Sequence, residues 1–226
     1  MRSECAYGGV NQSYFAAIVL VNPPVGSKAL QLSTTVFHDR PRQATLLDPD
    51  GKPVVGCQSQ GMTEFPWDFE TRLRASTFPI TKLHPDHGRR ITFVKEDRKL
   101  IGFLLARGDS VAPSIIRMQP WGLVTGRILD ENGKPVAATG LSAAWLGSET
   151  PTALNDPNIG EIPPTRCDGE GRFRSERLVP GQRYRANVYR DAGVAGMAFE
   201  NLVFKPGEVK DLGDIRTGKP IKVMGR

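Results

Sequence analysis

Two short motifs carry the side chains of this chain that most readily bind metal ions. His84-Pro-Asp-His87 offers two imidazoles and a carboxylate, which are donors that Zn²⁺ accepts. Asp168-Gly-Glu170-Gly places two carboxylates in a short segment, as calcium loops do. Against metal binding, the proline prevents the helix on which closely spaced histidines usually converge, and the acidic segment lacks the further oxygen donors of a calcium loop. We interpret both motifs as turns between strands, predict no cofactor, and keep these four residues as the ligands to test.

Catalytic residues are not marked anywhere in the sequence. Nucleophilic catalysis needs a nucleophile, a base and an orienting group in one place. The chain has three histidines, two of them in one turn, and it has no Gly-x-Ser-x-Gly elbow and no phosphate-binding glycine loop. Its three cysteines, Cys5, Cys57 and Cys167, lie in different parts of the chain, so no disulfide pairing follows. We predict that Cys57 is a buried small hydrophobic residue and that the protein is not an enzyme.

Aromatic and charged side chains gather in one segment of the first half of the chain. Phe65, Trp67 and Phe69 lie within five residues, and Arg72 and Arg74 follow. A ring face packs well on the C–H groups of a pyranose, while charged neighbours bond its hydroxyls, so the segment has the composition of a carbohydrate-binding platform. The alternative is that the three rings fold back as the lid of a hydrophobic core. The residues leave both interpretations open.

The chain is basic, with a formal net charge of +6 and a pI near 9.4. Four arginines alternate along two strand-like runs: Arg172, Arg174, Arg183 and Arg185. This spacing suggests one basic face. A protein that binds single-stranded nucleic acid also needs exposed aromatic rings, however, and only Tyr189 lies nearby. We therefore predict a solvated outer face with Phe173, Tyr184 and Val188 pointing inward, and no nucleic-acid partner. An acidic polysaccharide would also suit this charge.

A turn signature that occurs twice organises the chain. Asp48-Pro-Asp-Gly-Lys-Pro-Val54 and Asp130-Glu-Asn-Gly-Lys-Pro-Val136 both place Asp or Asn before Gly, which supplies the positive φ of a tight hairpin, and then use Pro to restart an extended chain. Further along, the segments 78–85 and 173–180 both read F-x-x-x-x-L-x-P. The order of these signals is the same in both halves, which indicates an internal repeat.

Between the turn signals, the apolar pattern is that of short strands. Alternating and β-branched runs occupy residues 30–37, 43–47, 90–95, 101–105, 114–118, 123–129, 184–189 and 195–199. Regular short strands punctuated by Gly and Pro are typical of antiparallel β-sandwiches. We predict an all-β chain of two tandem antiparallel Greek-key-type sandwiches.

The repeat also predicts domain boundaries. Residues 36–120 form the first repeat and 121–226 the second, while 1–35 are interpreted as the closing strands of a preceding unit or as extra edge strands. The apolar segment 13–21 fits a strand better than a signal peptide, because Glu4 lies beside Arg2 and no good cleavage site follows. No stretch approaches the roughly 20 apolar residues of a membrane span. We expect the chain to be the C-terminal part of a longer protein.

The second repeat resembles the carboxypeptidase regulatory-like domain. The matching segments are 124–136, 165–173, 178–184 and 205–213. The resemblance covers about residues 122–216 and, more loosely, 36–120, where the D-x-x-G-R-F hairpin is absent. It implies a seven-stranded, transthyretin-like (prealbumin-like) β-sandwich that serves as a scaffold without a conserved active site.

The tandem layout is similar to that of large surface or extracytoplasmic bacterial proteins, planctomycete ones in particular. The resemblance therefore implies a non-catalytic structural or interaction module that is periplasmic, secreted or on the cell surface. Its partners would be other domains of a parent protein, or a cell-surface protein or polysaccharide. The alternative function is a carbohydrate-binding module that uses the aromatic segment of the first repeat.

Overall fold

The computed structural model describes residues 41–62, 71–83, 88–109, 112–137, 140–145, 165–190 and 193–217, together with positions 26, 29 and 31. Regular structure within this part is β, apart from one short 3-10 turn, η1 (Glu96–Arg98). The predicted strands at 13–21 and 30–37 lie almost entirely outside the described residues, so the interpretation of 1–35 stays a prediction. The domain boundaries at residues 36 and 121 stay predictions as well.

The strands fall into two groups along the chain. The first group is β1 (Arg42–Leu47), β2 (Gln58–Gln60), β3 (Thr71–Arg72), β4 (Thr77–Ile80), β5 (Arg89–Lys95), β6 (Leu100–Ala106), β7 (Ser114–Arg117) and β8 (Gln119–Pro120). The second group is β9 (Gly122–Leu129), β10 (Gly140–Trp145), β11 (Thr165–Arg166), β12 (Arg172–Leu178), β13 (Arg183–Arg190), β14 (Gly193–Val203) and β15 (Val209–Arg216). We call the two groups the first and the second sandwich.

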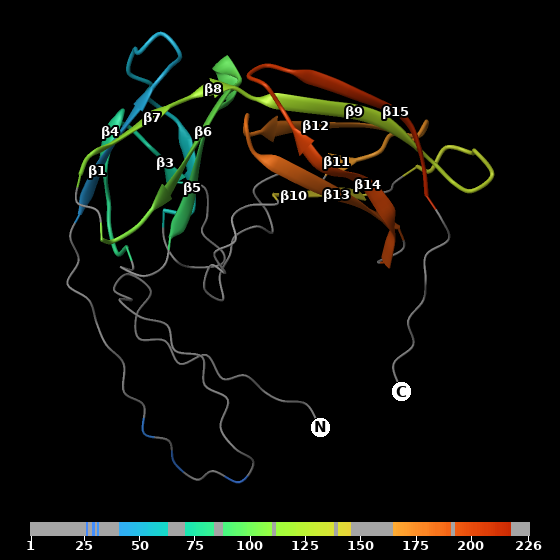
Figure 1. Cartoon of the computed structure of the whole chain (residues 1–226), viewed down its shortest axis with the longest axis horizontal. Helices are drawn as coiled ribbons and strands as arrows, with labels where there is room; N and C mark the ends of the chain where they lie inside the picture. The colour runs from blue at the N-terminus through green and yellow to red at the C-terminus, as the bar shows by residue number, and fades with distance from the viewer. Residues whose placement is uncertain are drawn as a thin grey trace.

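Both sandwiches have the same strand order (Figure 1). In the first, the sheet β4-β1-β7 packs against β3-β2-β5-β6-β8, and in the second, β12-β9-β15 packs against β11-β10-β13-β14. Taken in order, each strand from β9 to β15 has a counterpart from β1 to β7, and only β8 is extra. The repeat predicted from the turn signature is therefore a repeat of topology, and the predicted all-β sandwich class is confirmed.

Two strand pairings differ from the antiparallel prediction. The first strand of each sandwich runs parallel to the seventh one, β1 with β7 and β9 with β15. A two-residue hairpin forces its strands to be antiparallel, but these strands are joined through all the strands between them and are free to run in one direction. The other pairs that the structure describes are antiparallel, as predicted.

One carboxylate-capped turn occurs three times. Asp48, Asp130 and Asp168 each use Oδ1 to accept hydrogen bonds from the backbone N–H groups two and four residues ahead, at 2.8–3.0 Å. Aspartate suits this position because its short side chain reaches the backbone of its own turn. A glycine with positive φ closes each turn: Gly51, Gly133 and Gly171.

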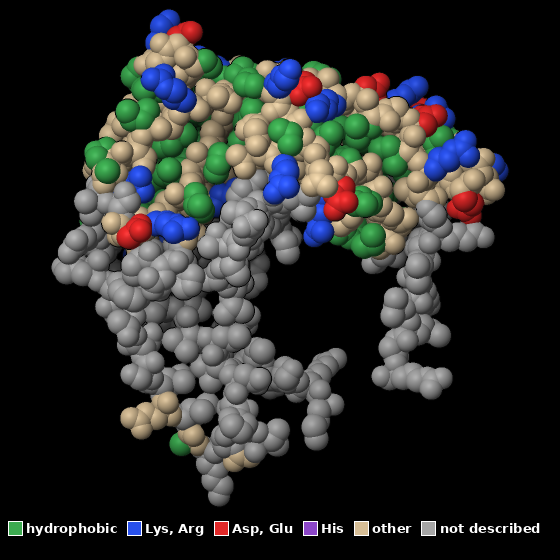
Figure 2. Space-filling model, viewed as in Figure 1, with side chains coloured by type: hydrophobic (Ala, Val, Ile, Leu, Met, Phe, Trp, Pro, Cys, Tyr) green, Lys and Arg blue, Asp and Glu red, His purple; other side chains and the backbone are tan. Residues whose placement is uncertain are grey.

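Two hydrophobic cores lie between the sheets. In the first, the rings of Phe78 and Phe93 meet with centroids 5.5 Å apart. In the second, Phe173, Tyr184 and Val188 are all buried, which confirms the predicted inward face. Charged side chains of both signs are interspersed over the outer surface shown in Figure 2.

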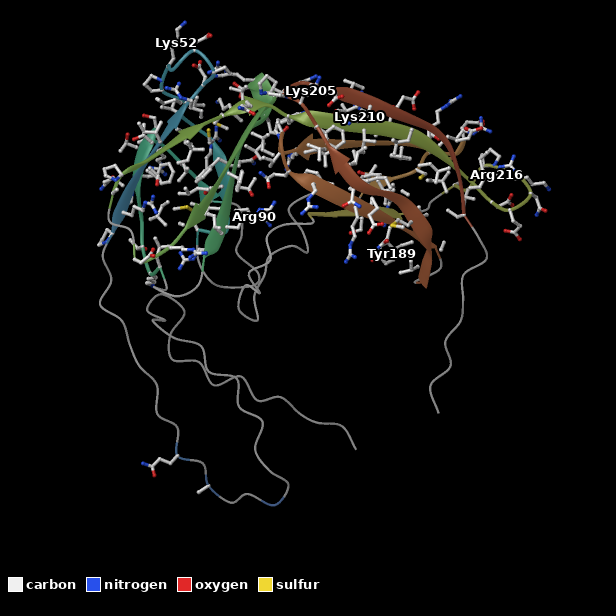
Figure 3. The ribbon with its side chains drawn as sticks, in the orientation of Figure 1. Lys52, Arg90, Tyr189, Lys205, Lys210 and Arg216 are labelled. Carbon is white, nitrogen blue, oxygen red and sulfur yellow. The ribbon has the colours of Figure 1, made fainter. Side chains whose placement is uncertain are left out.

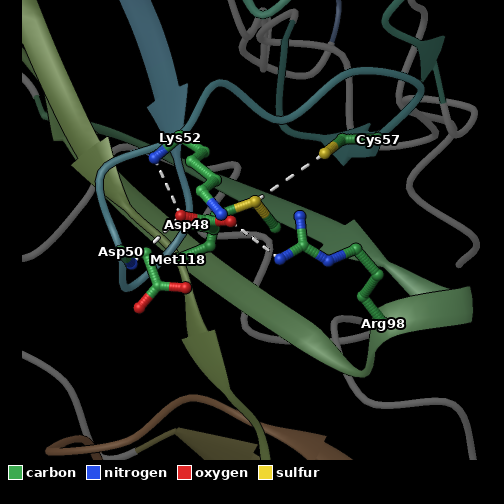
Figure 4. A network of polar contacts seen from close by, with 6 residues as sticks. All are labelled: Asp48, Asp50, Lys52, Cys57, Arg98 and Met118. Atoms are coloured by element: carbon green, nitrogen blue, oxygen red, sulfur yellow. Dashed lines mark hydrogen bonds and ion pairs between the residues drawn. The ribbon is translucent and has the colours of Figure 1, made fainter.

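Asp48 is a buried turn aspartate that also forms an ion pair. Its side chain is only 2% exposed, and Oδ2 lies 2.8 Å from a guanidinium nitrogen of Arg98 (Figure 4). Arg98 ends η1, so the pair ties the connection between β5 and β6 to the turn after β1. The hydrogen bond from Arg98, helped by the backbone N–H of Lys52, holds the pKa of Asp48 below its usual range.

Replacing Asp48 by Asn tests this pair. Asn keeps an oxygen for the turn but loses the charge, so we expect a lower Tm than wild type at neutral pH. Because the folded-state pKa of Asp48 is depressed, the wild-type advantage is present above its unfolded pKa of about 4 and disappears as the pH falls through the folded pKa. The measurement is Tm against pH for both proteins.

Asp50→Asn is the matched control, because it removes the same charge from an exposed position of the same turn. Its Tm should stay close to that of wild type across the series. A difference between wild type and Asp48→Asn that does not narrow in acid would show that the ion pair does not stabilise the fold.

Candidate functional site

Most of the predicted ligand-binding side chains lie outside the described residues. Phe65, Trp67 and Phe69 belong to the segment 63–70, and His84 and His87 belong to 84–87. The carbohydrate-binding platform and the histidine pair therefore stay predictions.

Arg72 and Arg74, which follow the aromatic segment, are both exposed. Arg72 lies on β3, the edge strand of its sheet, opposite Gln58 of β2. Arg74 lies in the connection to β4. Both guanidinium groups are open to solvent at the edge of the first sandwich, as a ligand contact would require.

Arg89 is a buried residue that joins two loops of the first sandwich. It is 7% exposed, and its guanidinium donates hydrogen bonds to the carbonyl oxygens of Met62 and Thr81, each at 2.9 Å, and to that of Lys82. Met62 is the last described residue before the aromatic segment, and Lys82 lies two residues before His84. Arg89 thus holds together the starting points of the two segments that the sequence singled out.

The counterpart of Arg89 in the second sandwich is Tyr184. Each is the fourth residue after the proline of the F-x-x-x-x-L-x-P motif, and the hydroxyl of Tyr184 accepts a hydrogen bond from the N–H of Val179 at 2.8 Å. Both side chains therefore anchor the start of a central strand to the loop before it. Sequence reasoning missed Arg89, although its alternation with the apolar Ile91 and Phe93 was the available signal.

The acidic turn has a structural explanation. The Asp168 carboxylate caps its own hairpin, and Glu170 is exposed at the tip. Across the described segments, no three His, Cys, Asp or Glu side chains come close enough together to hold a metal ion. Binding of metal at Asp168 would have to compete with two backbone hydrogen bonds.

The predicted single basic face is wrong. Arg172 and Arg174 lie on β12, whereas Arg183 and Arg185 lie on β13, which belongs to the opposite sheet. All four are exposed, so the prediction of outward-facing arginines is correct. The outer faces of two packed sheets point away from each other, and the arginines therefore form two separate pairs.

Cys57 is a buried thiol, as predicted. It is fully buried just before β2, and its Sγ lies 3.7 Å from the sulfur of Met118. Burial raises the pKa of the Cys57 thiol to about 11, so it stays protonated and a poor nucleophile at neutral pH. Cys167 is also buried.

The two sandwiches share an apolar junction. Ile101 of β6 is 2% exposed and belongs to the core of the second sandwich, together with Trp121. Trp121 lies in the segment 119–121 that connects the two sandwiches, which we call the linker. Val94 and Phe103, on the same outer face of the first sandwich, pack against that core as well. Among these outward side chains, Ile101 is buried and Val94 and Phe103 are partly buried between the two sandwiches.

Polar contacts close the rim of this junction. Glu96 of η1 forms an ion pair with Arg177 of β12. The carbonyl of Pro120 accepts a hydrogen bond from the N–H of Gly207 at 2.9 Å, while β8 pairs with β6. The linker is thus bound on one side to the first sandwich and on the other side to the second.

Comparison with known proteins gives weak structural likeness only. The chain resembles a streptococcal ancillary pilin (TM-score 0.34, 12% identity, 98% of this chain and 73% of that one) and the shaft pilin SpaA from Lactobacillus rhamnosus GG (0.29, 11%, 83% and 100%). It also resembles the Bacillus anthracis TIE protein (0.32, 11%, 80% of this chain), of which it spans about a third, 34%. These scores are too low to support an inference about this chain.

Other comparisons return nothing. No family model matches the chain, and no curated protein matches it. The resemblance to the carboxypeptidase regulatory-like domain therefore stays a prediction. No helix within the described residues is long and apolar enough to cross a membrane.

Replacing Arg89 by Met tests its role as an anchor. The change leaves three carbonyl oxygens without their charged donor inside the protein, so we expect a loss of at least about 2 kcal/mol in the free energy of unfolding. Arg172→Met, at an exposed position, should change it by less than about 0.5 kcal/mol. Urea unfolding of both variants measures the difference, and equal stabilities would refute the anchoring role.

Proposed function

We propose that this chain is a non-catalytic structural module in which two β-sandwiches are held as one rigid unit within a larger extracytoplasmic protein. The observation that carries the proposal is the junction at Ile101, a side chain of the first sandwich that is buried in the core of the second. A flexible linker would leave two domains free to move, whereas a hydrophobic interface between them restrains that motion. The buried junction suits a spacer that holds other parts of a protein at a fixed distance and angle.

Several features of the described residues are consistent with a scaffold. The repeated carboxylate is used to cap turns, and the thiol of Cys57 is buried and protonated. A carboxylate that bonds within its own turn and a buried, protonated thiol stabilise a fold but do not act on a substrate. We accordingly propose that the partners are other domains of the parent protein or a cell-surface protein or polysaccharide, and that the module is periplasmic, secreted or on the cell surface.

Rotational diffusion tests the rigid unit. NMR relaxation of the full chain should give both sandwiches one common correlation time, whereas Ile101→Asp, which places a charge inside the junction, should let each sandwich tumble on its own. Ile115→Asp is the matched control, because Ile115 is 66% exposed on β7. Two independent correlation times in wild type would contradict the proposal.

The energetic side of the junction gives a separate test. Ile101→Ala should lower the free energy of unfolding of the second sandwich by about 2–5 kcal/mol, because it opens a cavity in a core that belongs to that sandwich. Ile115→Ala should stay within about 0.5 kcal/mol of wild type. Hydrogen exchange resolves which sandwich is affected, and a loss confined to the first sandwich would show that Ile101 does not support the second.

A further inference from the structure

The outer face that carries the junction in the first sandwich has a counterpart in the second. The strand registers show which residues correspond. Val94 pairs with Ile101 across β5 and β6, and Tyr189 pairs with Val194 across β13 and β14. Val94 and Tyr189 are each the fifth residue after the anchor at the start of their strand. Tyr189 and Val194 therefore occupy the positions of Val94 and Ile101.

The third position of the junction face follows from the same registers. Phe103 lies opposite Thr92, and Met197 lies opposite Asn187, two residues before the Val94 and Tyr189 positions respectively. Met197 thus takes the place of Phe103. The three side chains that join the sandwiches all have apolar counterparts in the second sandwich, and we call Tyr189, Val194 and Met197 the distal face.

The two faces differ in what covers them. Ile101 is 2% exposed because the second sandwich packs on it, whereas Val194 is 54%, Met197 52% and Tyr189 39% exposed. Figure 3 shows Tyr189 on the second sandwich, away from its boundary with the first. Three large apolar side chains on neighbouring strands, all open to water, are a typical mark of an interaction surface.

The path of the chain supports the same correspondence. The backbone N–H of Met118 bonds to the carbonyl of Leu47, and that of Thr217 bonds to the carbonyl of Leu129, so both residues follow the seventh strand of their sandwich in the same way. Met118 lies against Gly102, and Thr217 lies against the counterpart glycine of β14. After Met118 the chain runs beside β6 and enters the second sandwich, and at Thr217 it lies at the same place beside β14.

We propose that the distal face is the docking surface for a further β-sandwich of this repeat type, seated as the second sandwich is seated on the first. The proposal rests on the junction at Ile101 and extends it to a second site. A partner that pairs edge to edge with β14 fits less well, because β14 shifts register three times against β13, and such bulges disfavour pairing with another strand. A further sandwich fits better, because it would cover the distal face with an apolar residue at its start, as the second sandwich has Trp121 before its first strand.

The surroundings of the distal face fit a junction with a polar rim. Arg185 is exposed on the same side of β13, and Glu200 is exposed on β14. Neither forms an ion pair with a residue in the part of the chain that the structure describes. Stable interfaces combine an apolar centre with charged groups at the edge, which is the arrangement of Glu96 and Arg177 around Ile101.

A lengthened chain tests the proposal directly. Residues 119–217 are repeated after Thr217, so that a third sandwich follows the second through a copy of the natural linker. We expect the three sandwiches to share one rotational correlation time, and the new linker to resist protease. Met197→Asp at the original position should release the third sandwich and speed cleavage of the new linker by about tenfold or more, because cleavage follows the population of the undocked form.

Controls separate this result from a folding defect and from failure of the first junction. Met197→Asp in the chain of natural length should keep the wild-type Tm, because the side chain is already exposed. Ile115→Asp in the lengthened chain should leave the third sandwich docked. A third sandwich that tumbles freely with Met197 intact, while the first two tumble together, overturns the docking surface and leaves the first junction standing. Equal release by Ile115→Asp overturns it too.

Discussion

The structure depends on one local interaction, the aspartate carboxylate that caps the turn after the first strand of each sandwich. By accepting two backbone N–H groups, Asp48 and Asp130 fix the length and direction of the turn, and the strand register follows from it. The tenth residue after each aspartate lies opposite the corresponding residue of the neighbouring strand in the sheet. Gln58 lies opposite Val94, and Gly140 lies opposite Tyr189. A one-residue slip at the turn would exchange the core face for the outer face in both sandwiches.

The two sandwiches anchor the start of their central strand with different side chains. Tyr184 uses a hydroxyl and an aromatic body, and its ring also packs near Phe204 at 6.3 Å between centroids. Arg89 uses a guanidinium with several donors at the same position, and it bonds to carbonyl oxygens of two loops. A guanidinium has five N–H donors in a fixed fork, whereas a hydroxyl has one donor and can also accept, so the two anchors suit different backbone groups. Arg89 binds carbonyl oxygens, and Tyr184 binds a backbone N–H.

The sequence allowed the repeat, the strands and the inward side chains to be predicted, because turn chemistry and two-residue alternation are local signals. Alternation tells which side of its own sheet a residue faces, but not which sheet the strand joins, and for this reason Arg172 and Arg183 were placed on one face although they lie on two sheets. The parallel pairing of β1 with β7 depends on contacts between the ends of a repeat. Aromatic residues 65–69 carry the predicted binding platform, and they lie outside the described residues.

The junction could not be read from the sequence for a related reason. An outward apolar residue such as Ile101 looks the same in a chain whether water or another sandwich covers it, and single exposed apolar residues are common on protein surfaces. The evidence becomes specific only when registers place Val94 and Ile101 over the same positions as Tyr189 and Val194. Ile101 on the outer face of the first sandwich is buried and Val94 is partly buried, while their counterparts Val194 and Tyr189 are exposed. Equal patterns with unequal burial are best explained when the repeat was built to be covered on that face in each copy.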